Sequence, residues 1–174
     1  MSEINIRVVV TGTDWMGSGI GSVESALEQL FREAKQEIIL TAYSISTRAD
    51  LLFDWMRTAL DRGVKISLII NRLDDQPYEV TTLLYQLADT YNHLQLYSFL
   101  SADHADLHAK VIVVDRQIAL IGSSNLSRRG LQSNHEMAVL FNGTAAASAA
   151  SGLDQLLKSQ DVARVPTPEN HNLR

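Results

Sequence analysis

The segment from residue 106 to residue 141, DLHAKVIVVDRQIALIGSSNLSRRGLQSNHEMAVLF, has the densest grouping of side chains that could do chemistry. His108 and Lys110 lie two residues apart just before a run of apolar residues, and Ser123 and Asn125 follow a second apolar run. Lysine supplies positive charge, serine and asparagine supply hydrogen-bond donors, and histidine can act as a nucleophile or a proton shuttle. This combination is suited to binding and attacking a phosphate group.

The alternation of residues around His108 predicts a β-strand and the directions of its side chains. Successive strand side chains point to opposite faces, so His108 and Lys110 share a face and lie about 7 Å apart. Asp115 has the opposite parity, at the end of this strand, and suits a turn. Glu136 begins a later strand and is expected to hold the tautomer of the imidazole, as carboxylates commonly do.

The turn of this hairpin determines which serine faces the histidine. A two-residue turn formed by residues 115 and 116 would place His108 across from Ser123. A three-residue turn would shift the pairing by one residue and bring Ser124 to that position instead. Gly122, just before these serines, is expected to let backbone or substrate approach closely.

The site is expected to need neither a metal ion nor a cofactor. A catalytic zinc requires about three protein ligands, and the ammonium of Lys110 would repel a cation. The chain has no cysteine, which excludes disulfides, thiolate nucleophiles and cysteine-based metal sites. A chain without cysteine fits the reducing cytoplasm, where we expect this protein.

Length and composition are typical of one globular domain, with 174 residues of which 45% are hydrophobic and 20% charged. The net charge is −5, from 15 basic and 20 acidic residues, so phosphate binding is expected to be local rather than spread over the surface. The beginning of the chain lacks the basic and apolar regions of a signal peptide, and no apolar run approaches the roughly 18 residues of a membrane span. We therefore expect no stable membrane association.

The elements that must position the polar side chains alternate between strands and helices. Strands are predicted at 6–11, 37–44, 64–71 and 94–99, followed by the two hairpin strands and a last strand at 135–141. Helices are predicted at 22–35, 51–60, 78–91 and 144–159, with Ser22 as N-cap and Gly63 as left-handed C-cap.

This order predicts a single α/β catalytic domain over residues 1–159. Its central sheet is expected to be mixed and mostly parallel, with about seven strands and helices on both faces. Residues 160–174 contain two prolines and are predicted to be a tail or a linker.

The spacing of the polar residues resembles the HKD signature of the phospholipase D superfamily. The matching positions are, in chain order, His108, Lys110, Asp115, Gly122, Ser123, Asn125 and Glu136. The order of strands and helices from about residue 20 to residue 158 also resembles one repeat of that fold. Larger lipases of the superfamily carry two motifs per chain, whereas this chain has one and resembles the bacterial endonuclease-type members.

The resemblance implies a metal-independent mechanism in a site shared by two subunits. Cleaving a phosphodiester needs a nucleophile and an acid, and one imidazole cannot serve both ends of an in-line displacement. In the implied homodimer, His108 of one subunit becomes a phosphohistidine and that of the other protonates the leaving group. By this resemblance, Lys110 and Asn125 hold the phosphate oxygens, and Ser123 and Glu136 orient the histidines. Asp115 has a structural role.

The leading hypothesis is an endonuclease that acts on nucleic acid as a homodimer. Arg48, Arg128 and Arg129 are expected to contact flanking phosphates, Arg48 from a loop after a strand and the other two from just after the motif. Two alternatives stay open. A phospholipase or another small phosphodiesterase would keep the chemistry and turn the loop around Trp15 and Met16 toward lipid. A non-catalytic module of a larger complex, for example in phage defence, would have neither activity.

Overall fold

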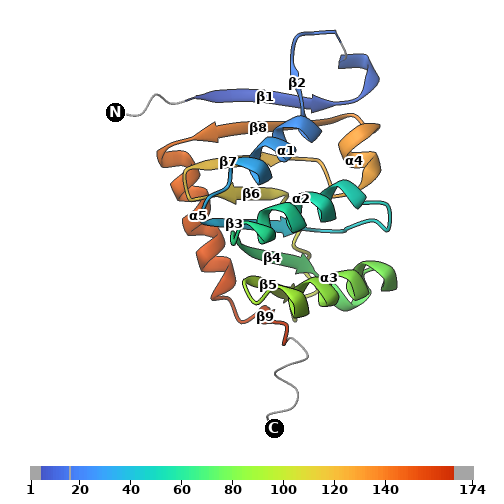
Figure 1. The fold of residues 1–174 in the computed structure, drawn as a ribbon, viewed down its shortest axis with the longest axis vertical. Coiled ribbons are helices and arrows are strands. Elements are labelled where there is room, and N and C mark those ends of the chain that lie inside the picture. Colours follow the sequence, from blue (N-terminus) through green and yellow to red (C-terminus); the bar gives the residue numbers. More distant parts are fainter. Residues whose placement is uncertain (1–4, 16, 167–174) are drawn as a thin grey trace.

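The computed structural model describes residues 5–15 and 17–166, and these residues form one nine-stranded sheet. Neighbouring strands follow the order β2-β1-β8-β7-β6-β3-β4-β5-β9 (Figure 1). The strands are β1 (Ile6–Thr11), β2 (Gly21–Ser22), β3 (Glu37–Ala42), β4 (Lys65–Asn71), β5 (Leu94–Phe99), β6 (Val111–Val114), β7 (Ile118–Gly122), β8 (Glu136–Asn142) and β9 (Val162–Arg164). The helices are α1 (Val23–Glu33), α2 (Asp50–Asp61), α3 (Tyr78–Thr90), α4 (Arg128–Gln132) and α5 (Thr144–Leu157), with single 3-10 turns η1 (Thr13–Trp15) and η2 (Leu73–Asp75).

The sheet is mixed and mostly antiparallel. Strands β3, β4 and β5 are parallel neighbours, as are β1 and β2, whereas the other five neighbouring pairs are antiparallel. The predicted α/β fold with helices on both faces is confirmed, but the predictions of about seven strands and of mostly parallel pairing are wrong. The longer parallel pairs are confined to β3–β5, because only there do α2 and α3 carry the chain back between strands.

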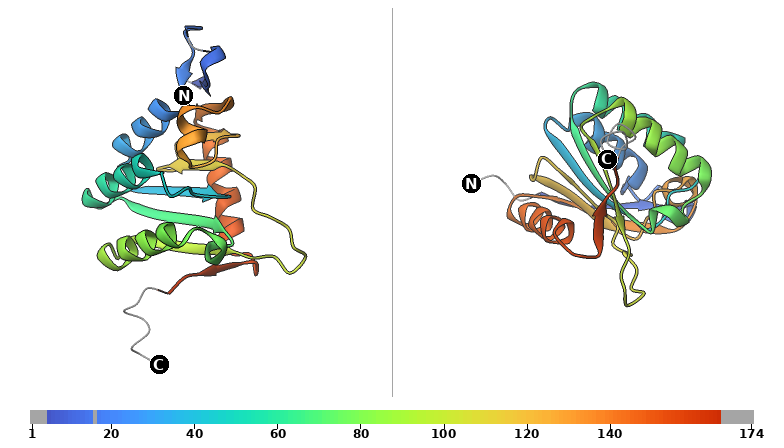
Figure 2. Two further views of the ribbon diagram at one scale, coloured as in Figure 1. Left: turned by 90° about the vertical axis from the view of Figure 1, so that its right-hand side faces the viewer. Right: turned by 90° about the horizontal axis from the view of Figure 1, so that it is seen from below.

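Helices α1, α2 and α3 cover one face of the sheet, and α5 covers part of the other (Figures 1 and 2). The larger core lies on the first face, where Phe31, Leu52 and Met56 are fully buried. On the second face, Ala146 and Ala150 bring α5 close to the sheet. The bulky apolar stripes of α1 and α2 therefore hold most of the core, while the alanine-rich α5 adds a thinner layer.

The predicted helix caps are confirmed. Ser22 has extended backbone angles, and its side chain accepts a hydrogen bond from the N–H of Ser25 at 3.0 Å, which satisfies a free donor of α1. Gly63 follows α2 with φ of 81°, and its N–H donates to the carbonyl of Leu60 at 2.8 Å. Such left-handed residues after a helix are usually glycine because a Cβ would clash there.

Part of the segment after residue 159, which was predicted to be a tail or a linker, joins the sheet. Val162–Arg164 form β9, which pairs antiparallel with β5 and adds an edge strand. The part of the predicted tail from 160 to 166 is therefore a loop and a strand, and its remainder lies outside the described residues. A three-residue strand has too few positions for an alternating pattern to reveal it. The catalytic-domain boundary at 159 stays a prediction.

The hairpin turn uses the predicted residues in a different register. Asp115 and Arg116 have left-handed backbone angles, with φ of 50° and 57°, and the N–H of Gln117 donates to the carbonyl of Val114 at 3.0 Å. Val114 nevertheless pairs with Ile118, one residue beyond the partner that a two-residue turn would give. The predicted two-residue register is wrong, and the three-residue alternative describes the pairing of β6 with β7.

Candidate active site

Five of the six predicted catalytic residues lie at one edge of the sheet, where β3, β4 and β7 end and β6 and β8 begin (Figure 1). His108 and Lys110 precede β6 in an extended segment, Ser123 and Asn125 follow β7, and Glu136 opens β8. In antiparallel pairs the end of one strand lies beside the start of the next, which brings these positions together. The segment between β5 and β6 projects from the sheet as a long loop (Figure 2).

This loop is held at its return by Asn71, a buried residue at the end of β4. The Oδ1 atom of Asn71 accepts a hydrogen bond from the N–H of Leu107 at 2.8 Å, and Nδ2 donates to Oδ1 of Asp106 at 3.2 Å. The backbone immediately before His108 is therefore fixed. Asn71 was not predicted as a site residue, and the only signal in the sequence is a polar residue at the end of an apolar strand.

Thr41 fixes the backbone on the other side of His108. Its Oγ1 donates to the carbonyl of Ala109 at 2.7 Å and accepts from the N–H of Val111 at 3.0 Å. Buried polar groups are normally paired in this way, and here the pairs connect β3 to the segment before β6. Asn71 and Thr41 together fix the backbone of the segment before β6, although this segment is not part of a strand.

The imidazole of His108 is exposed and contacts Tyr43 and Lys110. The ring centroids of Tyr43 and His108 are 4.7 Å apart in an edge-on arrangement. The Nζ atom of Lys110 is 3.0 Å from both Nδ1 and Nε2 of His108 and donates to the carbonyl oxygen of His108 at 2.9 Å. An ammonium has donors only, so an imidazole nitrogen that pairs with it must offer a lone pair. Sequence reasoning missed Tyr43, because no motif surrounds it.

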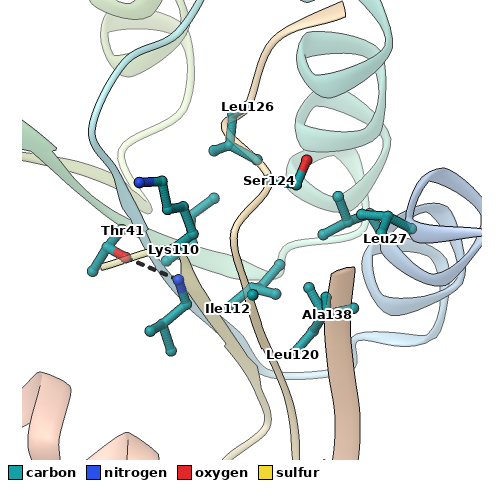
Figure 3. Close-up of a pocket in the computed structure, with 12 residues that line it drawn as sticks. Leu27, Thr41, Lys110, Ile112, Leu120, Ser124, Leu126 and Ala138 are labelled. Atoms are coloured by element: carbon teal, nitrogen blue, oxygen red, sulfur yellow. Dashed lines mark hydrogen bonds between the residues drawn. The ribbon is translucent and has the colours of Figure 1, made fainter. Parts of the chain in front are cut away.

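The stem of Lys110 lies over an apolar hollow, and its ammonium points away from the hollow (Figure 3). Leu27, Ile112 and Ala138 are among the lining residues. Burial lowers the pKa of Lys110, and the carboxylate of Glu136 partly offsets this by raising the same pKa. The apolar residues thus position the Lys110 ammonium at this edge of the sheet, and the burial makes the ammonium lose its proton more readily.

Ser123 and Glu136 form a hydrogen-bonded pair at this edge. The Oγ of Ser123 donates to Oε2 of Glu136 at 2.5 Å and accepts from the N–H of Met137 at 3.3 Å. Oε1 of Glu136 accepts from Nδ2 of Asn134 at 3.2 Å, and Glu136 is only 9% exposed. Within the described part of the chain, no hydrogen bond joins this pair to His108. The predicted role in orienting a histidine therefore stays a prediction.

Asn125 is positioned by a tight crossing between the segment after β7 and α4. A Cβ at Gly130 would lie 2.4 Å from the carbonyl oxygen of Asn125, so glycine is needed for α4 to pack this closely. Ser124 is buried, and its Oγ donates to the carbonyl of Gly130 at 2.9 Å. The Oδ1 atom of Asn125 is buried and has no hydrogen-bond partner among the described residues. Gly130 therefore affects the site by letting α4 pack closely against Asn125. Ser124 is buried in the same contact and binds α4 rather than facing the site.

Asp115 lies at the opposite edge of the sheet, in the hairpin turn. Its Oδ1 accepts hydrogen bonds from the N–H groups of Gln36 and Glu37 at 2.8 and 2.9 Å, and its Oδ2 accepts from the N–H of Lys35 at 2.9 Å. Seven residues of extended chain from His108 span about 23 Å. Asp115 is therefore separated from the other five residues, and its contacts agree with the structural role that the motif implies.

Two of the three predicted substrate-binding arginines meet at one hollow. Arg48 and Arg128 both line a hollow of about 300 Å³, whereas Arg129 is exposed and does not line it. The segments that carry the two arginines lie side by side, since Ile45 and Leu126 form a parallel bridge. This places two guanidinium groups beside the segment that contains Tyr43.

The loop after β1 contacts the residue next to Glu136. The rings of Trp15 and His135 pack edge-on with centroids 5.5 Å apart, and Oδ2 of Asp14 lies 2.9 Å from Nε2 of His135. Trp15 is half-buried by this contact, and Met16 lies outside the described residues. His135 is thus engaged with the loop after β1.

The described residues also bear on metal and membrane binding. Across 5–15 and 17–166, no three side chains of histidine, cysteine, aspartate or glutamate gather closely enough to hold a metal ion. No helix in the same ranges combines the length and the apolar composition needed to cross a bilayer. Metal independence and the lack of stable membrane association both stay predictions.

Gly122 is required by the packing of β7 against β8. A Cβ there would lie 2.4 Å from the Cβ of Ala138 and 2.6 Å from the carbonyl oxygen of Met137. We predict that Gly122→Ala lowers the free energy of unfolding by about 2–3 kcal/mol, measured by urea unfolding, because the strands must separate. Gly152→Ala is the control: no atom lies within 4 Å of the added Cβ in α5, and helix propensity favours alanine by up to about 1 kcal/mol. Equal effects of the two substitutions would contradict this account.

Comparison with known proteins agrees with this geometry. Residues 27–157 match the family model described as "Cardiolipin synthase, PLD-like domain". DISARM protein DrmC of Bacillus paralicheniformis is 24% identical over 141 residues, which are 81% of this chain and 58% of DrmC. Cardiolipin synthase A of Buchnera aphidicola is 28% identical over 141 residues, which are 79% of this chain and 27% of that protein. The chain therefore spans only part of the length of these curated relatives.

The fold is also that of a solved structure, the phospholipase D family member Nuc from Salmonella typhimurium. The two structures match with a TM-score of 0.75 and 20% sequence identity, over 95% of this chain and 100% of Nuc. The segment matched by the family model contains the whole motif from His108 to Glu136. This chain, as its motif predicted, belongs to the phospholipase D superfamily.

Proposed function

We propose that this chain is a metal-independent phosphodiesterase that cleaves nucleic acid through a phosphohistidine intermediate. The observation that carries the proposal is the contact of the exposed His108 imidazole with the Lys110 ammonium, whose Nζ lies 3.0 Å from both ring nitrogens. A phosphate oxygen at this position would meet a cation, and an imidazole nitrogen beside it could attack phosphorus. Asn125 would bind a phosphate oxygen through the N–H donors of Nδ2, and among the described residues its side chain makes no hydrogen bond within the protein.

The proposed reaction has two displacement steps. In the first, a ring nitrogen of His108 bonds to phosphorus while the bond from phosphorus to the leaving oxygen breaks and that oxygen gains a proton. In the second, water attacks the phosphohistidine and gives up a proton, and the phosphorus–nitrogen bond breaks to restore the imidazole. The proton donor of the first step must lie on the opposite side of phosphorus from His108.

A second copy of the chain supplies this donor. Within the described residues, His135 is engaged with Asp14 and Trp15 rather than with His108. A two-fold symmetric dimer would place His108 of the second copy across the phosphate from the first. The acid of one displacement then becomes the base that activates water in the next, as microscopic reversibility requires.

An exposed apolar patch borders the site and fits a second copy. It consists of Ile6, Val8, Ile121 and Met137, which are 40–66% exposed. The register of β1, β8 and β7 places these side chains on the sheet face that α5 leaves partly uncovered. Contiguous exposed apolar side chains commonly mark association sites, and this patch is continuous with Ser123 through its bonds to Met137.

We predict that Ile121→Asp converts the dimer to a monomer and lowers phosphodiesterase activity at least about 100-fold at concentrations where the wild type is dimeric, because a charge would be buried in an apolar interface. Sedimentation velocity and activity are measured on the same samples. Tyr78→Asp is the matched control, since Tyr78 is 80% exposed on α3, away from the patch. Active Ile121→Asp monomers, or an unchanged dimer, would contradict this interface.

Nucleic acid is the substrate that the surroundings of the site favour. Arg48 and Arg128 line one hollow beside the segment that carries Tyr43, where they could contact phosphates that flank the cleaved one. Two guanidinium groups that could hold successive phosphates of a polymer favour a nucleic acid over a lipid, which carries a single phosphodiester.

The test is a substrate panel in excess EDTA with the purified dimer. Single- and double-stranded DNA, RNA and vesicles of phosphatidylglycerol are compared with bis(p-nitrophenyl) phosphate as a generic phosphodiester. The proposal expects nucleic acids to be cleaved and vesicles to be left intact. Hydrolysis of the lipid alone would replace it by a phospholipase function, and no hydrolysis of any substrate would favour a non-catalytic module.

A further inference from the structure

A third hollow lies beside Tyr43, the residue whose ring contacts the imidazole of His108. Its volume is about 520 Å³, and it lies between the segments that follow β3 and β4, with Ser44, Arg72, Asp75 and Asp106 among its lining residues. The ring of Tyr43, which also lines it, contacts the imidazole of His108 at 4.7 Å between centroids. A group in this hollow would therefore lie next to a phosphate bound at His108.

The walls of this hollow are preformed. Gln76 accepts a hydrogen bond from the N–H of Ile45 at 3.1 Å and donates to the carbonyls of Tyr43 and Asn71 at 3.2 and 2.9 Å. One side chain thereby ties the end of β3 to the end of β4. Ligand sites are usually such preformed concave spaces, of roughly 300–1,000 Å³.

The polar groups of the hollow suit a neutral ligand that carries both donors and acceptors. Nε of Arg72 is 3.3 Å from Oδ1 of Asp106, but it is buried and has no aligned hydrogen-bond partner among the described residues. Within the same residues, the Asp75 carboxylate has no hydrogen bond or ion pair. Two carboxylates and one guanidinium make the hollow acidic, which disfavours a second phosphate there.

We propose that this hollow is a subsite for an unstacked guanine attached next to the cleaved phosphate. Arg72 can donate to O6 and N7 of guanine, the commonest specific arginine–base contact. The carboxylate of Asp75 can accept from the N1–H and N2–H groups on the Watson–Crick edge. The ring of Tyr43 offers a surface for stacking. The inference rests on the proposed nuclease function and adds a base preference to it.

The other bases and the lipid headgroups match these groups less well. Adenine has no O6 acceptor, and cytosine and uracil lack N7. Each of these bases would therefore leave Arg72 or Asp75 without one of its hydrogen-bond partners. The ammonium of an ethanolamine or choline headgroup has no acceptor atom, so it would leave the donors of Arg72 without a partner. A glycerol headgroup would leave the aromatic wall of Tyr43 unused.

The test uses four single-stranded oligonucleotides that differ only in one central base, cleaved in excess EDTA by the full chain. The ratio of the cleavage rate beside guanine to the mean rate beside the other bases is measured for each protein. We expect a ratio of at least about 25 for the wild type, because one good bidentate contact gives about 1–3 kcal/mol of discrimination and the guanine makes two. Asp75→Asn keeps the Arg72 contact and should lower the ratio at least about five-fold. The ratio is internal to each preparation, so a general loss of activity does not change it.

Asp74→Asn is the matched control, because Asp74 is the exposed neighbour of Asp75 and does not line the hollow. It should keep the wild-type ratio. Cleavage without base preference, or a preference that Asp75→Asn leaves intact, overturns the guanine subsite and leaves the nuclease function standing. Hydrolysis of bis(p-nitrophenyl) phosphate or of lipid without cleavage of any oligonucleotide overturns both.

Discussion

Replacing His108 with alanine should lower phosphodiesterase activity at least roughly 10⁴-fold, because the proposed dimer would then lack both its nucleophile and its acid. The imidazole is exposed, and Asn71 and Thr41 hold the backbone around it through their own bonds. The variant should therefore fold and dimerise like the wild type. Initial rates on nucleic acid in excess EDTA, together with the thermal midpoint of unfolding, separate loss of chemistry from loss of structure.

The control for this substitution is His104→Asn. His104 is exposed on the same projecting loop and has φ of 59°, a conformation that asparagine tolerates. Its activity should stay within about two-fold of wild type, as expected for an exposed residue away from the reacting groups. If His108→Ala kept more than a hundredth of the activity, the imidazole would not be the nucleophile.

Replacing Lys110 with methionine should lower kcat/KM by roughly 10²–10³-fold, a range typical for removing one group that stabilises transition-state charge. Methionine keeps an unbranched stem over the apolar hollow that Leu27 and Ala138 line. The fold should therefore be unaffected, and the loss should come from the missing positive charge. Steady-state kinetics measures the loss in kcat/KM, and near-UV circular dichroism measures whether the fold is unchanged.

The same lysine should also set the alkaline limit of activity. Burial lowers the pKa of Lys110, so the ammonium is lost at a lower pH than for an ordinary lysine, and activity should fall as pH rises through that lowered pKa. Lys110→Arg should move this alkaline limb to higher pH, because a guanidinium stays protonated throughout. An alkaline limb unchanged in the arginine variant would assign it to another group.

Local patterns made much of the fold predictable. Alternation and helical periodicity indicated most strands and the four long helices, and Ser22 and Gly63 act as the caps that their types suggest. Pairing between distant strands was not predictable in this way. The place of β1 beside β8, the short β9, and the register of the hairpin depend on tertiary contacts, which leave no periodic trace in the sequence.

The residues of the candidate site were likewise only partly predictable from the sequence. The spacing of His108, Lys110 and Asn125 was sufficient to predict that these residues lie at the same end of the sheet, because they belong to one short segment. Tyr43 and Asn71 reach the same edge from the ends of β3 and β4, and only the pairing of those strands brings them to His108. Neither residue stands in a motif, so sequence alone could not have connected them to the site.

The most direct test of a site shared by two copies is the activity of mixed dimers. Wild-type and His108→Ala chains are unfolded together and refolded at different ratios, so that subunits pair at random, and the nuclease rate is plotted against the wild-type fraction. If both imidazoles serve one phosphate, the rate follows the square of that fraction, and an equal mixture keeps about one quarter of the wild-type rate. A linear dependence, with about one half remaining at an equal ratio, would show that each chain carries a complete site and would contradict the account.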